Sequence, residues 1–182
     1  AESMLFTAGY LWTSYQFGIK KGSAPIKDWA DLKGKVVSVN KGTPYETLSK
    51  AEGAKHGFTV QAYDTQPDAT QAVLSGRAYA TLGGNTTIVY AASKTPDFVA
   101  DLELTTTRAH WAAPFPKGSV ALRNQMQDVL DCMKKDGTIA KLSEKWFGKA
   151  PGPDALERVI TPGYGVPGMP GYDPTPHELK CG

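Results

Sequence analysis

Two glycine-containing segments carry the residue types best suited to binding a small molecule. The first is Gly42-Thr43-Pro44-Tyr45-Glu46, which follows a β-branched run and opens a helical pattern. Thr43 is predicted as an N-cap, Pro44 suits the first helical position, and Glu46 completes a Thr-x-x-Glu capping box. Backbone N–H groups at such a helix start can bind an anion. A well-capped helix that binds nothing is the alternative on these residues alone.

The second segment runs from Gly83 to Thr87 and again joins a strand pattern to a helix pattern. Gly84 lets a ligand approach the backbone closely, and Asn85 and Thr86 offer side-chain hydrogen bonds. In open α/β sheets, ligands gather at the carboxyl ends of strands. Both segments lie at predicted strand ends, so together they indicate one small-molecule-binding face.

The usual catalytic and metal-binding patterns do not occur. His56, His110 and His177 have no partners at metal-ligand or triad spacing, and no nucleophile elbow, zincin or Walker motif is present. We therefore predict neither an enzyme nor a cofactor or metal site. Cys132 and Cys181 fit no zinc pattern, and they are either one disulfide or two unrelated thiols.

Charge and length limit the class of protein. The formal net charge of the 182-residue chain is +2 and its lysines are scattered, which argues against nucleic acid as a partner. The length allows one domain or two small lobes, and no apolar stretch is long enough to span a bilayer. Residues 1–6 lack the features of a signal peptide, so we expect a chain that begins after processing or is a fragment.

The elements that must position the two segments alternate along the chain. Strands are predicted at 35–40, 59–63 and 78–82, and helices at 44–55, 67–75 and 86–93. Strands that alternate with helices of about ten residues predict a parallel, layered α/β unit.

The pattern changes in the last part of the chain. An extended segment is predicted at 109–115, followed by helices at 119–134 and at 138–147. The first helix carries a continuous apolar stripe, formed by Leu122, Met126, Val129, Leu130 and Met133. From residue 150 onward, proline and glycine exclude regular helix or sheet. We expect this tail to lie against the body of the protein, anchored by Cys181, with a disordered tail as the alternative.

Six segments, in this order, carry a family resemblance: Phe6 to Tyr10, Phe17 to Ser23, Trp29 to Val39, Gly42-Thr43, Leu74 to Ala80, and Lys134 to Gly148. Their order and spacing over residues 5–148 resemble the family 3 extracellular solute-binding proteins, of the polar-amino-acid type. One departure is Tyr79, which stands where the family usually has aspartate.

The resemblance implies an α/β fold of the type II periplasmic-binding-protein class. This chain would supply lobe II, the hinge strands and the C-terminal helices of lobe I. The implied parts are a hinge-entry segment at 1–21, lobe II at 22–109, the return hinge and lobe I helices at 110–148, and the tail at 149–182. A large N-terminal part of lobe I would be missing from the chain, either lost or present as a separate chain.

The function implied by the resemblance is that of the substrate-binding component of an ABC importer. Such a protein is exported to the periplasm, captures an amino acid or related solute between its lobes, and docks in its closed form on a membrane permease. Two alternatives share the fold: a dehydratase of the cyclohexadienyl or prephenate type, and a ligand-sensing domain.

The resemblance also assigns site residues. The expected ligand-binding set is Gly42, Thr43, Pro44, Tyr45, Gly84, Asn85 and Thr86. Gly42 and Thr43 match the lobe II position that meets the ligand carboxylate. Gly84 stands where many members place the aspartate that pairs with the ligand α-ammonium. We therefore expect a ligand that lacks a free α-amino group or binds in another pose.

Overall fold

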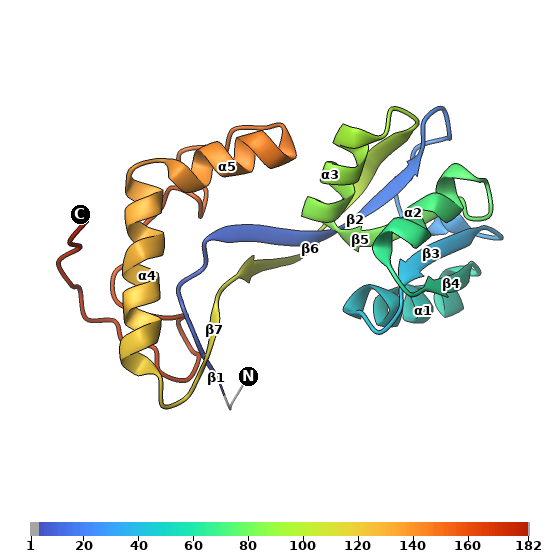
Figure 1. The fold of residues 1–182 in the computed structure, drawn as a ribbon. Helices are drawn as coiled ribbons and strands as arrows, with labels where there is room; N and C mark the ends of the chain where they lie inside the picture. Colours follow the sequence, from blue (N-terminus) through green and yellow to red (C-terminus); the bar gives the residue numbers. More distant parts are fainter. Residues whose placement is uncertain (1–3, 182) are drawn as a thin grey trace. The chain divides into compact units, whose positions relative to one another are not determined.

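The chain divides into two units in a computed structural model that describes residues 4–181. One unit is Thr13–Arg108, and the other combines the residues up to Trp12 with those from Ala109 onward. Two long strands, β2 (Leu11–Lys20) and β6 (Phe98–Trp111), pass from one unit into the other (Figure 1). None of the helices in the described part of the chain is long and apolar enough to cross a membrane.

A five-stranded sheet of order β4-β3-β5-β2-β6 forms the centre of the first unit. Its remaining strands are β3 (Val36–Asn40), β4 (Thr59–Tyr63) and β5 (Ala80–Gly84). β3 runs parallel to both β4 and β5, whereas β2 is antiparallel to β5. The sheet is therefore mixed, and the prediction of a parallel unit holds only for the strands that alternate with helices. The two strands that connect the units lie outside that alternation.

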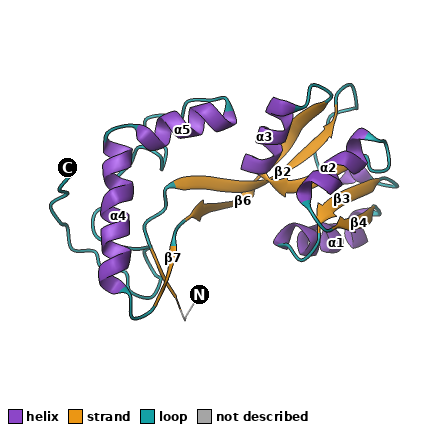
Figure 2. Ribbon diagram, in the orientation of Figure 1, coloured by secondary structure: helices purple, strands orange, loops and turns teal. Residues whose placement is uncertain are grey.

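Three α-helices and a short 3-10 helix accompany this sheet (Figure 2). They are η1 (Trp29–Leu32), α1 (Pro44–His56), α2 (Gln66–Leu74) and α3 (Asn85–Lys94). Alternation along β3 separates the two faces of the sheet. Val37 and Val39 belong to a core that includes residues of η1 and α1, whereas Ser38 donates a hydrogen bond to Ala69 of α2.

The second unit contains a short antiparallel pair and two helices. Strand β1 (Met4–Phe6) pairs with β7 (Pro114–Pro116), and the helices are α4 (Val120–Lys135) and α5 (Thr138–Phe147). Both predicted helices of this region are present within a residue or so of their expected bounds, whereas the predicted extended segment at 109–115 is divided between the end of β6, which begins at Phe98, and β7.

Helix α4 buries polar side chains and exposes part of its apolar stripe, namely Leu122, Met126 and Val129, whereas Leu130 of the same stripe is buried. Arg123 and Gln127 are each 1% exposed, whereas Leu122 is 57% and Val129 is 54% exposed. The buried side chains bind the backbone at the end of β1 and just after it: the Arg123 guanidinium donates to the Phe6 carbonyl, and Gln127 accepts from the Ala8 amide. Helical periodicity identified the stripe but gave no information on which face of the helix is covered.

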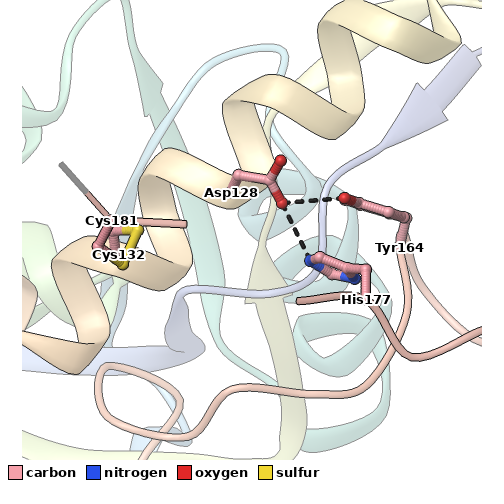
Figure 3. Close-up of a disulfide and its surroundings, with 5 residues drawn as sticks. All are labelled: Asp128, Cys132, Tyr164, His177 and Cys181. Carbon is pink, nitrogen blue, oxygen red and sulfur yellow. Dashed lines mark hydrogen bonds and ion pairs between the residues drawn. A yellow bond between two sulfur atoms is a disulfide. The ribbon is translucent and has the colours of Figure 1, made fainter. Parts of the chain in front are cut away.

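The C-terminal tail packs against α4, as expected, and a disulfide ties down its end. Cys132 and Cys181 are bonded at a sequence separation of 49, which decides between the two interpretations of these cysteines. Asp128 of α4 accepts from the Tyr164 hydroxyl and pairs with His177 Nε2, both at 3.0 Å (Figure 3). Although no sequence spacing indicated it, His177 therefore has an acidic partner, and both lie beside the disulfide. The trio fastens the tail to α4.

Candidate ligand-binding site

The first predicted segment forms the turn from β3 into α1. Thr43 has an extended backbone and its hydroxyl accepts from the Glu46 amide, so it caps the helix as predicted, with Pro44 in the first turn. Gly42 has a φ of +73°, a conformation that favours glycine. Three features of the sequence, the glycine, the N-cap and the proline, therefore act together within a single turn.

The Glu46 side chain differs from the predicted capping box. Its carboxylate accepts from the Gly42 amide at 2.7 Å and from Lys50 Nζ at 2.6 Å, instead of reaching the N-cap amide. Hydrogen bonds from Lys50 and then from Gly42 lower the pKa of Glu46 below its ordinary value. The Gly42 amide is thus already occupied by an internal carboxylate. The Tyr45 amide, at the second helical position, has no intrahelical acceptor and can serve an anion instead.

The second predicted segment forms the turn from β5 into α3. Gly84 is the N-cap of α3 and provides no side-chain cap. The side-chain oxygen of Asn85 accepts from the Thr86 amide at 2.8 Å and, at 3.4 Å, from the Ser14 amide and the Thr13 hydroxyl of β2. Asn85 therefore fastens the start of α3 to β2, and its carbonyl oxygen is engaged within the protein.

The two turns meet through Tyr45. Because β3 and β5 are neighbouring parallel strands, their carboxyl ends lie at the same edge of the sheet. A Cβ atom added to Gly84 would lie 2.8 Å from the Tyr45 hydroxyl oxygen, so this phenol occupies the space beside the glycine. The Tyr45 ring also packs edge-to-face on Tyr15 of β2, with ring centroids 4.7 Å apart. Burial, and to a smaller extent Tyr15, raises the pKa of the Tyr45 phenol.

A hollow of about 780 Å³ lies beside this contact. It is lined by Tyr15, Gly42, Thr43, Pro44, Thr47, Leu48, Ala51 and Thr107. Three of the seven predicted ligand-binding residues, at positions 42–44, are in that lining. The other four, Tyr45, Gly84, Asn85 and Thr86, are not in that lining. None of the eight lining side chains carries a charge near neutral pH.

Sequence reasoning missed the lining residues that come from the long strands. Tyr15 belongs to β2, and Thr107 belongs to β6 and accepts from the Tyr15 amide at 2.8 Å. Thr47 and Leu48 could have been found, because they follow Pro44 by three and four residues on one helix face. No local signal pointed to Thr107. No group of three or more His, Cys, Asp or Glu residues in the described part of the chain could hold a metal ion.

Residues 1–149 match a family model described as bacterial extracellular solute-binding proteins, family 3. The L-cystine-binding protein TcyJ of Escherichia coli (strain K12) is 35% identical over 79% of this chain and 53% of its own length. The probable amino-acid-binding protein YxeM of Bacillus subtilis (strain 168) is 30% identical, over 81% of this chain and 57% of its length. The chain thus spans little more than half the length of these relatives.

A solved structure with the same fold is an ancestral amino acid-binding protein described as a precursor of cyclohexadienyl dehydratase. It is 31% identical, with a TM-score of 0.68, over 80% of this chain and 62% of that structure. The chain therefore has the α/β fold of type II periplasmic binding proteins, as expected from the resemblance.

Proposed function

Because the chain belongs to the bacterial extracellular solute-binding proteins of family 3, we propose that it is part of the substrate-binding component of an ABC importer. In this role it captures an amino acid or a related small solute in the hollow beside α1. The observation that carries the proposal is the position of this hollow, at the carboxyl end of β3 and the N-terminus of α1, where backbone N–H groups favour a carboxylate.

The same assignment gives roles to the two units. Unit Thr13–Arg108 acts as lobe II, β2 and β6 act as the hinge strands, and α4 and α5 belong to lobe I. Solute binding then selects a closed form of the two lobes, which docks on the membrane permease. Periplasmic location agrees with the disulfide, because disulfides persist in oxidising compartments.

The exposed apolar stripe of α4 supports a further part of lobe I as the partner of this face. Leu122, Met126 and Val129 are all more than one-third exposed, and exposed apolar patches of this kind mark interaction sites. The relatives contain more residues than this chain matches. We assign the missing part of lobe I to this face, supplied by the same protein or by a separate chain.

A dehydratase is the alternative, because one structural neighbour is described as the precursor of such an enzyme. Dehydration requires a positioned general acid or base. The lining of the hollow offers the Tyr15 phenol as a candidate acid or base, but no carboxylic acid, histidine, lysine or cysteine. The lining therefore favours a receptor over an enzyme.

Thermal-shift screening of the full-length protein against amino acids and organic acids tests the proposal. A solute at 100 times its Kd should stabilise the protein by about 2.7 kcal/mol through mass action, without turnover. Ala51→Trp fills the hollow from an exposed helix position and should abolish this stabilisation. Ala54→Trp, also exposed on α1 but outside the lining, is the matched control and should retain it. Loss of stabilisation in both variants, or in neither, would contradict the assignment of the hollow.

A further inference from the structure

A second hollow, of about 320 Å³, lies within the unit Thr13–Arg108 and gathers cationic side chains. Three cations line it, and they come from separate segments of the chain: Lys20, Lys35 and Arg77. The rest of the lining is Ser23, Val36, Val73, Gly76, Ala78 and Tyr79. Positive charge therefore dominates this feature, which we call the cationic hollow.

Strand register places the cationic hollow at one edge of the sheet. In the parallel pair of β3 and β5, Val37 is opposite Ala80, and in the antiparallel pair of β2 and β5, Ile19 is opposite the same residue. Lys20, at the end of β2, and Lys35, just before β3, therefore lie at the amino ends of β3 and β5. The hollow beside α1 lies at the carboxyl end of β3, so the two hollows occupy opposite edges of one sheet.

Aromatic rings position two of the three cations. Lys35 Nζ lies 3.5 Å from the centroid of the Tyr79 ring, and the Tyr79 hydroxyl donates to the Ala24 carbonyl. The Arg77 guanidinium carbon lies 5.9 Å from the centroid of the Tyr63 ring. An aromatic face attracts a cation but does not neutralise it as a carboxylate would. The two side chains are thus held in place while their charge can still act on an anion.

The Arg77 guanidinium is fixed through one of its N–H groups. Its Nε donates to the Ser75 hydroxyl at 3.1 Å, and that hydroxyl donates to the Ala72 carbonyl. The two terminal amino groups of the guanidinium point their donors as a fork, which matches two oxygens of a phosphate or a carboxylate. The ammonium groups of Lys20 and Lys35 line the same hollow, so an anion with several negatively charged oxygens fits best.

One acidic side chain, Asp31, acts electrostatically on Lys35 from outside the lining of the cationic hollow. Its carboxylate accepts from the backbone amides of Lys27 at 2.7 Å and of Asp28 at 3.3 Å, at the start of η1. These amides, and to a smaller extent the charges of Lys27 and Lys35, lower the pKa of Asp31. Three cations and this one carboxylate together keep a net positive charge.

We propose that the cationic hollow is an anion-binding site, separate from the hollow beside α1, and that it holds a phosphate group between Lys20, Lys35 and Arg77. The phosphate group can be a free phosphate or part of an anionic lipid headgroup, which share this chemistry. The inference goes beyond solute capture and does not depend on it, because the two hollows have no lining residue in common.

Isothermal titration of the full-length protein with inorganic phosphate at low ionic strength tests the inference. Phosphate should bind with a Kd of about 1 mM or tighter, and acetate should bind at least about ten times more weakly. Added salt should weaken phosphate binding, because it screens exposed charges.

Co-sedimentation with vesicles of phosphatidylcholine, with and without phosphatidylglycerol, distinguishes the two sources of the phosphate group. Binding to the vesicles that contain phosphatidylglycerol, without binding of inorganic phosphate, assigns the site to a lipid headgroup. Binding of inorganic phosphate alone assigns it to a free phosphate. Absence of binding in both experiments would overturn the inference and leave solute capture unaffected.

Three charge-neutralising variants locate the site. Lys20→Gln and Arg77→Gln each remove one charge from an exposed position in the lining and should weaken binding by at least about tenfold. Lys21→Gln removes the same charge from an exposed position outside the lining and is the matched control, with less than about a twofold change. Melting temperatures without ligand show whether each variant folds. Equal losses in all three variants, or unchanged binding in both lining variants, would overturn the assignment of the site.

Discussion

Asp131 and Lys134 form an ion pair inside the second unit, with Lys134 Nζ 3.3 Å from the Asp131 carboxylate and both side chains almost fully buried. Lys134 also donates to the Gly9 carbonyl at 2.9 Å, so one ammonium links α4 to the segment after β1. Burial raises the pKa of Asp131, and Lys134 acts against that rise. The pair therefore affects stability mainly when one partner is removed, because the other charge is then left buried without a partner.

Lys134→Met should destabilise the protein by about 3–5 kcal/mol, because it leaves a buried carboxylate without its partner. The folded-state pKa of Asp131 then lies further above the unfolded value. The stability of the variant is accordingly retained below the pKa that Asp131 has in the unfolded chain. It is lost as pH rises through the pKa that Asp131 has in the folded protein. Denaturant unfolding between acidic and neutral pH measures this. Lys135→Met, at the exposed neighbouring position, is the control and should change stability by less than about 0.5 kcal/mol. Equal effects of the two variants would contradict the account.

Residue-level prediction of the turn before α1 succeeded because its signal is local. The β-branched run before Gly42, the N-cap at Thr43 and the proline after it act within one turn, and the structure places all three at the start of α1. Tyr15 and Thr107 reach the hollow from β2 and β6, far from α1 in sequence. No local pattern in the sequence indicates that Tyr15 and Thr107 line the same hollow as residues of α1.

At the level of elements, α4 shows what periodicity does not decide. The apolar residues recur at helical spacing, yet the face that packs within the described chain is the one with Arg123 and Gln127. These two side chains satisfy backbone groups of residues 6–8 and of the tail, including the Gly171 and Gly163 carbonyls. Helix bounds were predictable from capping and breaking residues, whereas this burial depends on segments distant in sequence.

The tail should depend on its disulfide. Replacing both cysteines, Cys132→Ser with Cys181→Ser, should reduce the free energy of unfolding by about 4 kcal/mol on the chain-entropy model for a loop of this size. Reductant should produce a similar loss in the wild type and none in the double variant, as measured by denaturant unfolding. A wild type that is insensitive to reductant and as stable as the double variant would contradict a structural role for the bond.

At the level of the whole molecule, we propose that a solute binds where the carboxyl ends of β3 and β5 meet the helices that follow them. Family membership supports capture of a solute, and the hollow beside α1 lies at the carboxyl end of β3. The exposed stripe of α4 concerns a different surface, which we assign to the remainder of lobe I. An experiment that tests this proposal must therefore report where the solute binds on the protein as well as how tightly it binds.

Backbone-amide NMR of the full-length protein, titrated with a solute that stabilises it, reports both the location and the affinity of solute binding. We expect saturable shifts concentrated at Thr43, Tyr45 and Gly84 and at the hollow-lining residues of α1, with the Tyr45 amide among the largest. Saturable shifts confined to other parts of the protein, with these amides unchanged, would contradict this proposal.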